Sequence, residues 1–264
     1  MSFTIDLSDK VVLVTGAVSG IGAAVAEQFA RAGARLAGCG LENDMDESVI
    51  AFKQLAQRFG TDCLYTQTDV TDMAQLERLV KGIVTHFGKL DIVVSNAGAN
   101  VFQGAEACTE EQWTYNQDLN LASHWRLTRL CKPYLEISGG VIIIMTSNHA
   151  YATIPGCFPY NIAKAALTAL VKSLAIEWGP SIRTVGLAPG FIDTPGNQAW
   201  FASFPDPARE RARTEDTHPV KRIGTPEEVG AWCVFLASDY SAFASGVTYL
   251  LDGGRSALLQ DSVG

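Results

Sequence analysis

The sequence predicts a doubly wound α/β domain, in which helices cover both faces of a seven-stranded parallel sheet. Seven short apolar runs alternate along the chain with six segments of helix length. The first run, Val11–Val14, is apolar throughout, which is typical of a strand buried on both faces. Strands that alternate with helices pair in parallel. Because no repeat, low-complexity tract or hinge-like linker divides the chain, we expect one domain over residues 1–264.

The expected elements follow one another in a regular order. The strands are the short apolar runs at 11–14, 35–39, 63–68, 91–95, 141–146, 182–188 and 246–251. The helices are the longer segments at 20–32, 44–59, 72–87, 109–137, 158–179 and 225–238. Two helices have readable starts, because Thr109 with Gln112 and Thr225 with Glu228 fit capping boxes. The last helix carries apolar residues at helical spacing, which we interpret as core or subunit contacts.

Residues 191–217 are rich in proline, aromatic and charged residues, and they interrupt the alternation. Long insertions in compact domains often cover active sites, so we interpret this segment as a substrate lid. Arg209, Arg211 and Arg213 fall on an expected lid helix. We interpret them as a solvated face rather than as substrate contacts.

Composition and charge argue against several classes of function. The chain is 47% hydrophobic and carries a net charge of −8 without a Lys/Arg cluster, which argues against a nucleic-acid surface. Its six cysteines show neither Cys-x-x-Cys spacing nor histidine partners, and no apolar stretch is long enough to span a bilayer. The four histidines lack metal-ligand spacing. We expect a cytoplasmic protein with a small-molecule substrate and no metal, membrane or nucleic-acid partner.

The first apolar run leads directly into a glycine-rich turn and a helix. Gly16, Gly20 and Gly22 are spaced as Gly-x-x-x-Gly-x-Gly. Such a turn lets backbone N–H groups approach a pyrophosphate, and the helix N-terminus adds partial positive charge. A tight turn alone also favours glycine, but the position between a buried strand and a helix favours a dinucleotide site. The expected fold is therefore of the Rossmann type.

Tyr160, Lys164 and Ser147 form the second chemical signal. Tyr160 and Lys164 are one helical turn apart, so they lie on the same face of a helix, and Ser147 ends an expected strand before them. The pKa of a free tyrosine is about 10, and lowering it by about 3 units requires roughly 4 kcal/mol. A cation about 4 Å away supplies roughly that much at an effective dielectric constant of about 20. We therefore expect Lys164 to lower the pKa of Tyr160, which would then transfer protons.

These motifs, with others in the same order, resemble those of the short-chain dehydrogenase/reductase family over essentially the whole chain. One departure is Ser95, which stands where many members have asparagine. The further motifs are Asp69-Val70 after the third strand, Asn96-Ala97-Gly98 after the fourth, Asn120 in the long helix, Pro189-Gly190-Phe191-Ile192-Asp193-Thr194 after the sixth strand, and an Asp-Gly-Gly turn within 246–254.

The resemblance implies a role for each residue. Tyr160 would be the general acid/base, and Lys164 would lower its pKa and hold the nicotinamide ribose. Ser147 would hydrogen-bond the substrate oxygen, and Asn120 would support a water in a proton relay. Members are usually dimers or tetramers, and we expect a homotetramer. The expected cofactor contacts are Gly16, Ser19, Gly20, Ile21, Gly22, Leu41, Glu42, Asp69, Val70, Asn96, Ala97, Gly98, Tyr160, Lys164, Pro189, Gly190, Ile192 and Thr194.

The end of the second strand bears on the choice between NAD and NADP. NAD-dependent members usually carry an aspartate there for the ribose hydroxyls, but this chain has Gly40. NADP-dependent relatives often place a basic residue at the position of Leu41 or Ser19, and neither is basic here. Glu42 would repel the additional phosphate of NADP if it points inward. We therefore expect NAD rather than NADP, although Glu42 could also be a solvated loop carboxylate.

The sequence indicates the substrate less clearly than it indicates the fold and the cofactor. His149, Cys157 and Trp200, with Ser147 and Tyr160, are the expected substrate contacts. Polar groups among aromatic ones favour a small polyhydroxylated alcohol, such as a sugar, polyol or sugar acid. The alternatives are a hydrophobic steroid-like or terpenoid alcohol and, in a different class, a nucleotide-binding regulator without turnover.

Overall fold

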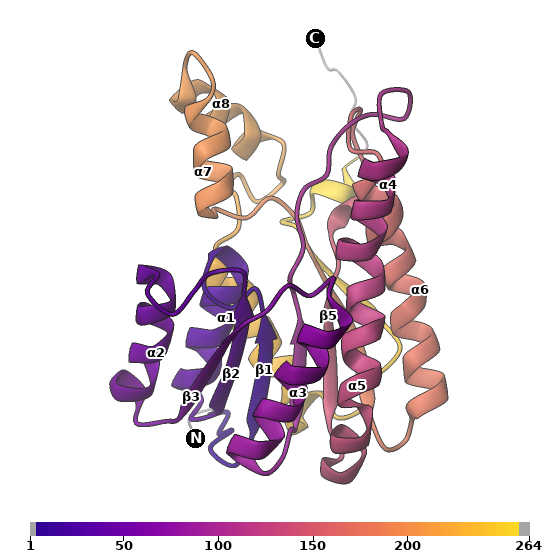
Figure 1. Ribbon diagram of the computed structural model, residues 1–264. Coiled ribbons are helices and arrows are strands. Elements are labelled where there is room, and N and C mark those ends of the chain that lie inside the picture. The colour runs from indigo at the N-terminus through magenta and orange to yellow at the C-terminus, as the bar shows by residue number, and fades with distance from the viewer. Residues whose placement is uncertain (1–3, 259–264) are drawn as a thin grey trace.

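The computed structural model describes residues 4–258. All seven strands pair in parallel in one sheet of order β3-β2-β1-β4-β5-β6-β7, and helices cover both faces (Figure 1). The predicted fold class is confirmed. The strands are β1 (Val11–Thr15), β2 (Arg35–Gly40), β3 (Cys63–Gln67), β4 (Ile92–Ser95), β5 (Val141–Met145), β6 (Arg183–Pro189) and β7 (Thr248–Leu251).

The order of the strands reverses between β1 and β4. The chain runs outward from β1 through β2 to β3 and then returns to β4, on the other side of β1. In open sheets, ligands bind beyond the carboxyl ends of the strands at such a switch point. The turns after β1 and β4, which carry Gly16 and Asn96, meet at this point.

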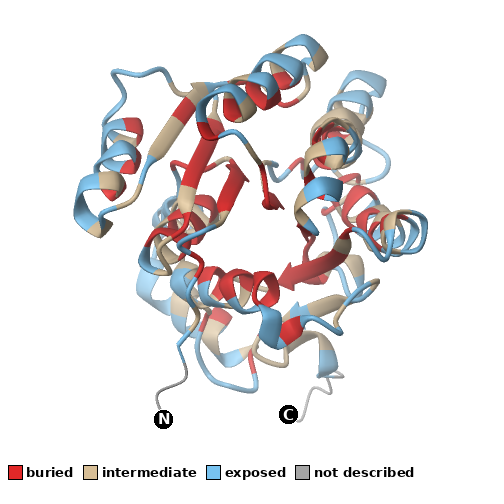
Figure 2. Cartoon of the chain, turned by 90° about the horizontal axis from the view of Figure 1, so that it is seen from below, coloured by how far each residue is buried: buried red, intermediate tan, exposed pale blue. Residues whose placement is uncertain are grey.

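Two apolar clusters fill the space between the sheet and its helices. On one face, α1 (Gly20–Arg31), α2 (Glu47–Phe59) and α9 (Pro226–Ala237) bury side chains that include Phe29, Phe52 and Val229. On the other face, α3 (Met73–Phe87), α5 (Ser123–Ser138) and α6 (Tyr160–Trp178) bury Ile83 and Leu127 among others. Figure 2 shows buried strands between helices whose outer sides are exposed.

The single helix expected over 109–137 is interrupted. α4 (Glu110–Gln117) leads into a π-helical turn, η1 (Asp118–Ala122), and α5 begins only after it. A π turn inserts one residue without breaking the helical rod, so apolar periodicity does not reveal it. Both predicted capping boxes form, at Thr109 and at Thr225.

Residues 191–217 contain two helices, α7 (Pro195–Ala202) and α8 (Pro207–Asp216), which stand beyond the carboxyl ends of the strands (Figure 1, orange). Arg211 forms ion pairs with Asp193 at 2.6 Å and with Glu215 at 3.1 Å. Arg213 pairs with Glu210. These two arginines therefore find their counterions inside the segment, which agrees with a solvated face. The role of the segment as a lid stays a prediction.

All six cysteines carry free thiols. Within residues 4–258, no group of three or more His, Cys, Asp or Glu side chains is placed to hold a metal ion. In the same range, the helices are too short or too polar to cross a membrane.

Candidate active site

Four side chains named from the sequence converge at the carboxyl ends of β4 and β5. Ser147 follows β5 and caps the short helix η2 (Asn148–Ala150), whereas Tyr160 and Lys164 lie in the first two turns of α6. Asn120 reaches the same region from η1. All four side chains are buried, so their polar groups are removed from bulk water.

The phenol of Tyr160 is held in its protonated form. Burial raises its pKa to about 12, and a hydrogen bond with the Ser147 side chain opposes that shift only in part. Ser147 Oγ also accepts the backbone N–H of His149 at 3.2 Å. The expectation that Lys164 lowers the pKa of Tyr160 is wrong for this arrangement, because the desolvation of the phenolate outweighs every favourable interaction.

The ammonium group of Lys164 is directed into the protein. Its Nζ donates a hydrogen bond to Met145 O at 3.1 Å and lies 5.5 Å from the centre of the Tyr160 ring. The side chain is 3% exposed, and burial lowers the pKa of Lys164 to about 8. The pKa of Lys164 therefore lies close to neutral pH, where the side chain can exchange its proton.

Asn120 is fixed by three hydrogen bonds. Its Oδ1 accepts the N–H of Ala99 at 3.1 Å, and its Nδ2 donates to Ala99 O at 3.0 Å and to Asn116 Oδ1 at 2.9 Å. A Cβ added to Gly98 would lie 2.7 Å from Asn120 Oδ1 and 3.5 Å from Lys164 Nζ. Both polar groups thus face the backbone of Gly98, and only glycine leaves that space open.

The glycine-rich turn after β1 has the geometry of a phosphate cradle. Gly16 and Gly20 adopt positive φ angles of 64° and 50°, which favour glycine. A Cβ on Gly22 would overlap Gly16 O and approach Asn96 Nδ2 to 2.7 Å. Ser19, the N-cap residue of α1, makes no side-chain capping bond, so the first N–H groups of this helix remain available to an anion. Ile21 packs against the adjacent apolar cluster.

The turn after β4 is fastened onto the end of β1. Thr15 Oγ1 accepts the N–H groups of Asn96 and Ala97, both at 2.9 Å, and Asn96 Nδ2 donates to Thr15 O at 2.9 Å. These bonds hold the Asn-Ala-Gly backbone beside Gly16. The two turns together form one wall at the switch point.

The other expected cofactor positions surround this wall. Asp69 Oδ1 accepts the N–H and the hydroxyl of Thr71, at 2.8 and 2.7 Å, so it orders the turn after β3, where Val70 is buried. Thr194 caps α7, and a Cβ on Gly20 would lie 3.4 Å from its methyl group. Of the remaining positions, Pro189 ends β6, Gly190 packs against Asp252, Ile192 is buried and Leu41 is 68% exposed.

The carboxylate of Glu42 lies at the end of β2. Its Oε2 touches the point where a side chain on Gly40 would begin. Tyr65, on the neighbouring strand β3, donates a hydrogen bond to Glu42 O at 3.0 Å and lies 3.5 Å from Oε2. The Glu42 carboxylate therefore lies at the end of β2, at the position that an acidic side chain on residue 40 would occupy.

These features fit a dinucleotide. Positive-φ glycines and an uncapped helix N-terminus suit a pyrophosphate, and a carboxylate at the end of β2 suits ribose hydroxyls. The buried Lys164 lies beyond the Asn-Ala-Gly turn, at the end of the site where Tyr160 stands. The residues present are thus compatible with a nicotinamide cofactor along this edge of the sheet.

Of the three expected substrate contacts other than Ser147 and Tyr160, two adjoin Tyr160 and one does not. The ring centre of His149 lies 6.1 Å from that of Tyr160, and Phe102, which sequence reasoning did not include, lies 5.3 Å from it. Cys157 is buried close enough to influence the pKa of Tyr160. Trp200 instead belongs to an aromatic group within the lid segment, with Phe191, Phe201 and Phe204.

Ser95 and His124, which sequence reasoning did not include, form a buried pair next to the site. Ser95 Oγ lies 2.7 Å from His124 Nδ1, and Nε2 of the same imidazole has no hydrogen-bond partner among residues 4–258. Burial, followed by the charge of Lys164, lowers the pKa of His124 well below its usual value. His124 is therefore neutral. The only sequence signal was the serine at position 95, where asparagine was expected.

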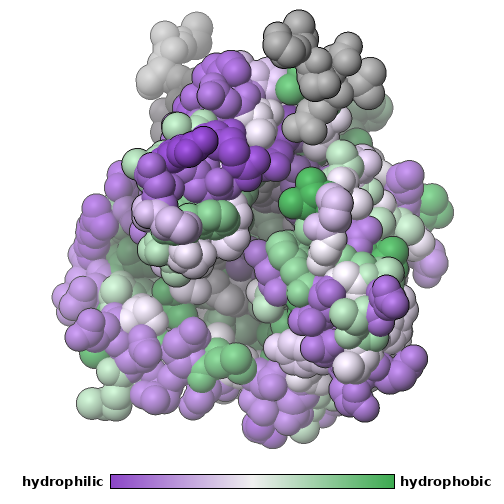
Figure 3. Space-filling model, turned by 90° about the horizontal axis from the view of Figure 1, so that it is seen from above, coloured by the Kyte–Doolittle hydropathy of each residue, from purple (hydrophilic) through white to green (hydrophobic). Residues whose placement is uncertain are grey.

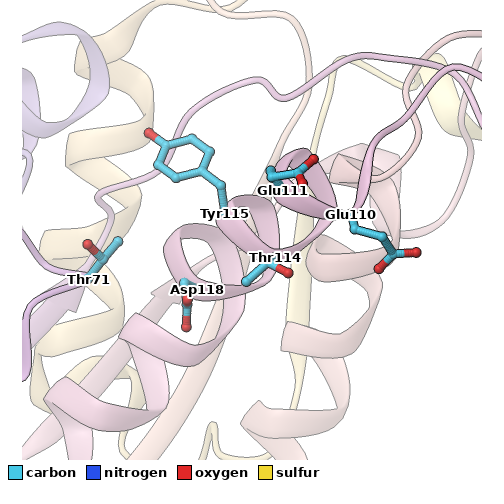
Figure 4. A pocket seen from close by; sticks show the side chains of 6 residues that line it. All are labelled: Thr71, Glu110, Glu111, Thr114, Tyr115 and Asp118. Atoms are coloured by element: carbon cyan, nitrogen blue, oxygen red, sulfur yellow. The ribbon is translucent and has the colours of Figure 1, made fainter.

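Two hollows of the surface differ in their position and their lining residues. At the end of the molecule that carries the lid segment, a hollow opens beside strongly hydrophilic residues (Figure 3). A separate hollow of about 460 Å³ lies between α4 and the turn after β3 (Figure 4). Three of its six lining side chains, Glu110, Glu111 and Asp118, carry carboxylates, and neither Tyr160 nor Lys164 lines it. This acidic hollow is unsuited to a phosphate-bearing ligand.

Comparison with known proteins identifies the family of this chain. Residues 16–256 match a family model described as enoyl-(acyl carrier protein) reductase. Human dehydrogenase/reductase SDR family member 4 is 34% identical over 258 residues, 96% of this chain and 90% of its own. The NAD-dependent glycerol dehydrogenase of Listeria innocua is 31% identical, over 94% of each chain.

A solved structure has a similar backbone over nearly the whole of this chain. Aldohexose dehydrogenase from Thermoplasma acidophilum superposes with a TM-score of 0.87 at 28% identity, over 97% of both chains. Sequence, fold and site geometry therefore agree, and the chain belongs to the short-chain dehydrogenase/reductase family of oxidoreductases.

Proposed function

We propose that the protein is an NAD-dependent enzyme that interconverts a secondary alcohol and a ketone on a small polyhydroxylated molecule: a sugar, polyol or sugar acid. The observation that carries this proposal is the buried set of Ser147, Tyr160 and Lys164 beside a turn that suits a dinucleotide. The alternative of a binding protein without turnover would not require a complete proton-transfer set in a water-excluded site.

Tyr160 is proposed to move the proton. Its phenol adjoins the Ser147 hydroxyl, so a substrate oxygen that contacts both would be held while its charge changes. When bound, the nicotinamide exchanges the hydride and, in its oxidised form, brings a positive charge. In ketone reduction Tyr160 would donate its own proton to the substrate oxygen. In alcohol oxidation the positive charge of the oxidised nicotinamide would favour the phenolate, so Tyr160 would first release its proton toward Lys164 and then receive the proton of the substrate hydroxyl.

Lys164 and Asn120 are proposed to connect Tyr160 with solvent. Lys164 has a pKa of about 8, and it faces the same glycine backbone as the Asn120 carbonyl. A water held by Asn120 would pass protons to and from Lys164, which would also hold the nicotinamide ribose. Asn120 owes its position to the π turn η1.

The preference for NAD is proposed from Glu42. Its carboxylate occupies the side-chain position of Gly40, where it can accept hydrogen bonds from ribose hydroxyls and would repel a 2′-phosphate. The exposed Leu41 offers no compensating cation.

Support for a polyhydroxylated substrate comes from the mixed surroundings of Tyr160. His149 and Ser147 offer hydrogen bonds, whereas Phe102 offers an apolar ring face. Two similar proteins are named for glycerol and aldohexose dehydrogenation.

We also propose a homotetramer, because Ile176 and Phe243 are 81% and 106% exposed and suit subunit contacts.

A dehydrogenase screen tests the proposal. NADH absorbance would be followed with purified protein over sugars, polyols, sugar acids and hydroxysteroids, with either NAD or NADP. We expect turnover with NAD and a polyhydroxylated substrate. Turnover confined to hydroxysteroids would contradict the substrate class. Tight NADH binding without turnover of any alcohol would favour the regulator.

A further inference from the structure

Asn116 is a buried amide one helical turn before Asn120. It lies near the end of α4, where its side chain is 0% exposed, although the other side chains of this helix are exposed or half-buried. Residues four positions apart lie on the same face of a helix, so the two asparagines face the same side. Burying an amide is costly unless its N–H and C=O groups are hydrogen-bonded. The partners of Asn116 therefore indicate why this buried position is polar.

Both ends of the Asn116 amide are bonded to parts of the candidate active site. Its Nδ2 donates to Pro159 O at 3.1 Å, and its Oδ1 accepts Asn120 Nδ2 at 2.9 Å. Pro159 is the N-cap residue of α6 and directly precedes Tyr160. The helices α4 and α6 lie side by side (Figure 1). One side chain thus connects the start of the helix that carries Tyr160 and Lys164 to η1, which carries Asn120.

These bonds determine which way the two amides point. A backbone carbonyl only accepts hydrogen bonds, so Pro159 O requires the Nδ2 of Asn116 and leaves Asn116 Oδ1 for Asn120. Asn116 Oδ1 in turn requires Asn120 Nδ2, whose second hydrogen goes to Ala99 O at 3.0 Å. Asn120 Oδ1 is then directed to the N–H of Ala99, at 3.1 Å. The bonds with Ala99 favour the same orientation, and Asn116 adds the connection to α6.

The Oδ1 atom of Asn120 faces the same space as the Lys164 ammonium. A Cβ added to Gly98 would lie 2.7 Å from Asn120 Oδ1 and 3.5 Å from Lys164 Nζ. An ammonium has three N–H donors, and one of those on Lys164 goes to Met145 O. An acceptor on this side therefore suits the ammonium, or a water that accepts from it and donates to Asn120. A reversed Asn120 amide would present hydrogens there instead, and its Oδ1 would meet the Oδ1 of Asn116.

We infer that Asn116 is a positioning residue for proton transfer: it holds the Asn120 carbonyl toward Lys164 and fixes its place relative to the start of α6. This inference rests on the proposed function and extends it. Asn116 acts through Asn120 and Pro159, to which its side chain is bonded. Sequence reasoning did not include Asn116, because an asparagine among polar residues gives no signal of burial.

Asn116→Asp and Asn116→Leu test the two bonds. A protonated carboxyl group has the shape of the amide and offers one donor and one acceptor, whereas a carboxylate cannot donate to Pro159 O. Burial raises the pKa of a carboxyl group, so the protonated form is the one present at low pH. We expect the kcat of Asn116→Asp to be within about threefold of wild type at about pH 6 and at least about tenfold lower at about pH 9. Asn116→Leu, which can form neither bond, should lose at least about tenfold in kcat at both pH values.

The matched control is Thr128→Val. Thr128, on α5, is also 0% exposed, but its hydroxyl donates to His124 O at 2.9 Å and to Trp125 O at 3.1 Å, within its own helix. Its kcat should stay within about twofold of wild type at both pH values. The KM for NAD should also stay within about twofold in all three variants, because the changed side chains lie outside the proposed cofactor contacts.

Two results would overturn the inference. The first is a ratio of kcat between Asn116→Asp and wild type that is the same at pH 6 and pH 9. The second is a loss in kcat that Thr128→Val shares with Asn116→Leu. A structural role alone would lower the unfolding temperature and leave the first ratio independent of pH. If Asn116→Leu does not fold, the pH dependence of Asn116→Asp decides.

Hydrogen exchange of the Asn120 side-chain amide requires no turnover, so it separates this inference from the proposed function. NMR would follow the two Nδ2 hydrogens, assigned by their absence in Asn120→Asp. We expect them to exchange at least about tenfold faster in Asn116→Leu than in wild type or Thr128→Val. Faster exchange in a protein whose wild type oxidises no alcohol would support the hold of Asn116 on Asn120 while refuting the enzyme. Equal exchange, in a protein whose wild type turns over its substrate, would do the reverse.

Discussion

Lys164 Nζ lies 5.5 Å from the centre of the Tyr160 ring, but its hydrogen bond goes to Met145 O. The two residues therefore share one buried space in which neither charged form is stabilised by the other. Burial raises the pKa of Tyr160 to about 12 and lowers that of Lys164 to about 8. Both shifts favour neutral side chains: the Tyr160 phenol keeps its proton more firmly, and the Lys164 ammonium releases its proton more readily.

Replacing Lys164 should stabilise the fold while it abolishes turnover. A pKa lowered from 10.5 to about 8 means that the buried ammonium costs about 3 kcal/mol at neutral pH. Lys164→Met removes that cost but also leaves Met145 O without its donor. We expect the free energy of unfolding to rise by about 1–3 kcal/mol in urea titrations without cofactor. A destabilised Lys164→Met protein would contradict the buried-cation description.

The gain in the free energy of unfolding from Lys164→Met should depend on pH in a defined direction. Between pH 8 and 10.5 an unfolded chain retains the Lys164 proton that the folded chain has released, so wild-type stability rises with pH in this window. The advantage of Lys164→Met is therefore full below pH 8 and disappears as pH approaches 10.5. Tyr160 acts oppositely from pH 10 to about 12, where the folded chain keeps the proton and stability falls. Urea titrations at pH 7 and pH 10 measure the difference.

Glu42 should govern the choice of cofactor. Glu42→Gln removes the negative charge beside Gly40 and should reduce the ratio of kcat/KM for NAD over NADP by about tenfold. Asp44→Asn is the matched control, because Asp44 is exposed and pairs with Lys53 at 3.0 Å. It should leave the ratio unchanged. A wild-type preference for NADP, or an equal effect of both variants, would refute the role of Glu42.

Two glycine substitutions should have opposite effects. In Gly22→Ala the new methyl group meets Gly16 O, so we expect at least tenfold weaker NADH binding and a loss of about 1–3 kcal/mol in stability. Gly82, inside α3, has open space around it, and Gly82→Ala should add about 0.5–1 kcal/mol without affecting NADH binding. Fluorescence titration with NADH and thermal unfolding measure both. Normal NADH affinity in Gly22→Ala would place the cofactor elsewhere.

The fold could be predicted from the sequence because the signals for its strands and helices are local and repeated. The run Val11–Val14 is a strand buried at every position, and the caps at Thr109 and Thr225 form as predicted. The π turn that carries Asn120 was not predictable from periodicity. The pKa of Tyr160 depends on desolvation, which spacing alone does not contain. Likewise, Ser95 and His124 meet only through tertiary packing.

The most direct test of the proposed mechanism is Tyr160→Phe. This change removes one hydroxyl from a buried ring and leaves the glycine-rich turn, Glu42 and Lys164 in place. Turnover would be measured with a substrate of the wild type, and NADH affinity by fluorescence titration. We predict a kcat at least about 100-fold lower, with NADH affinity and thermal unfolding close to wild type. A Tyr160→Phe protein that binds NADH and retains wild-type kcat would contradict Tyr160 as the proton-transfer residue.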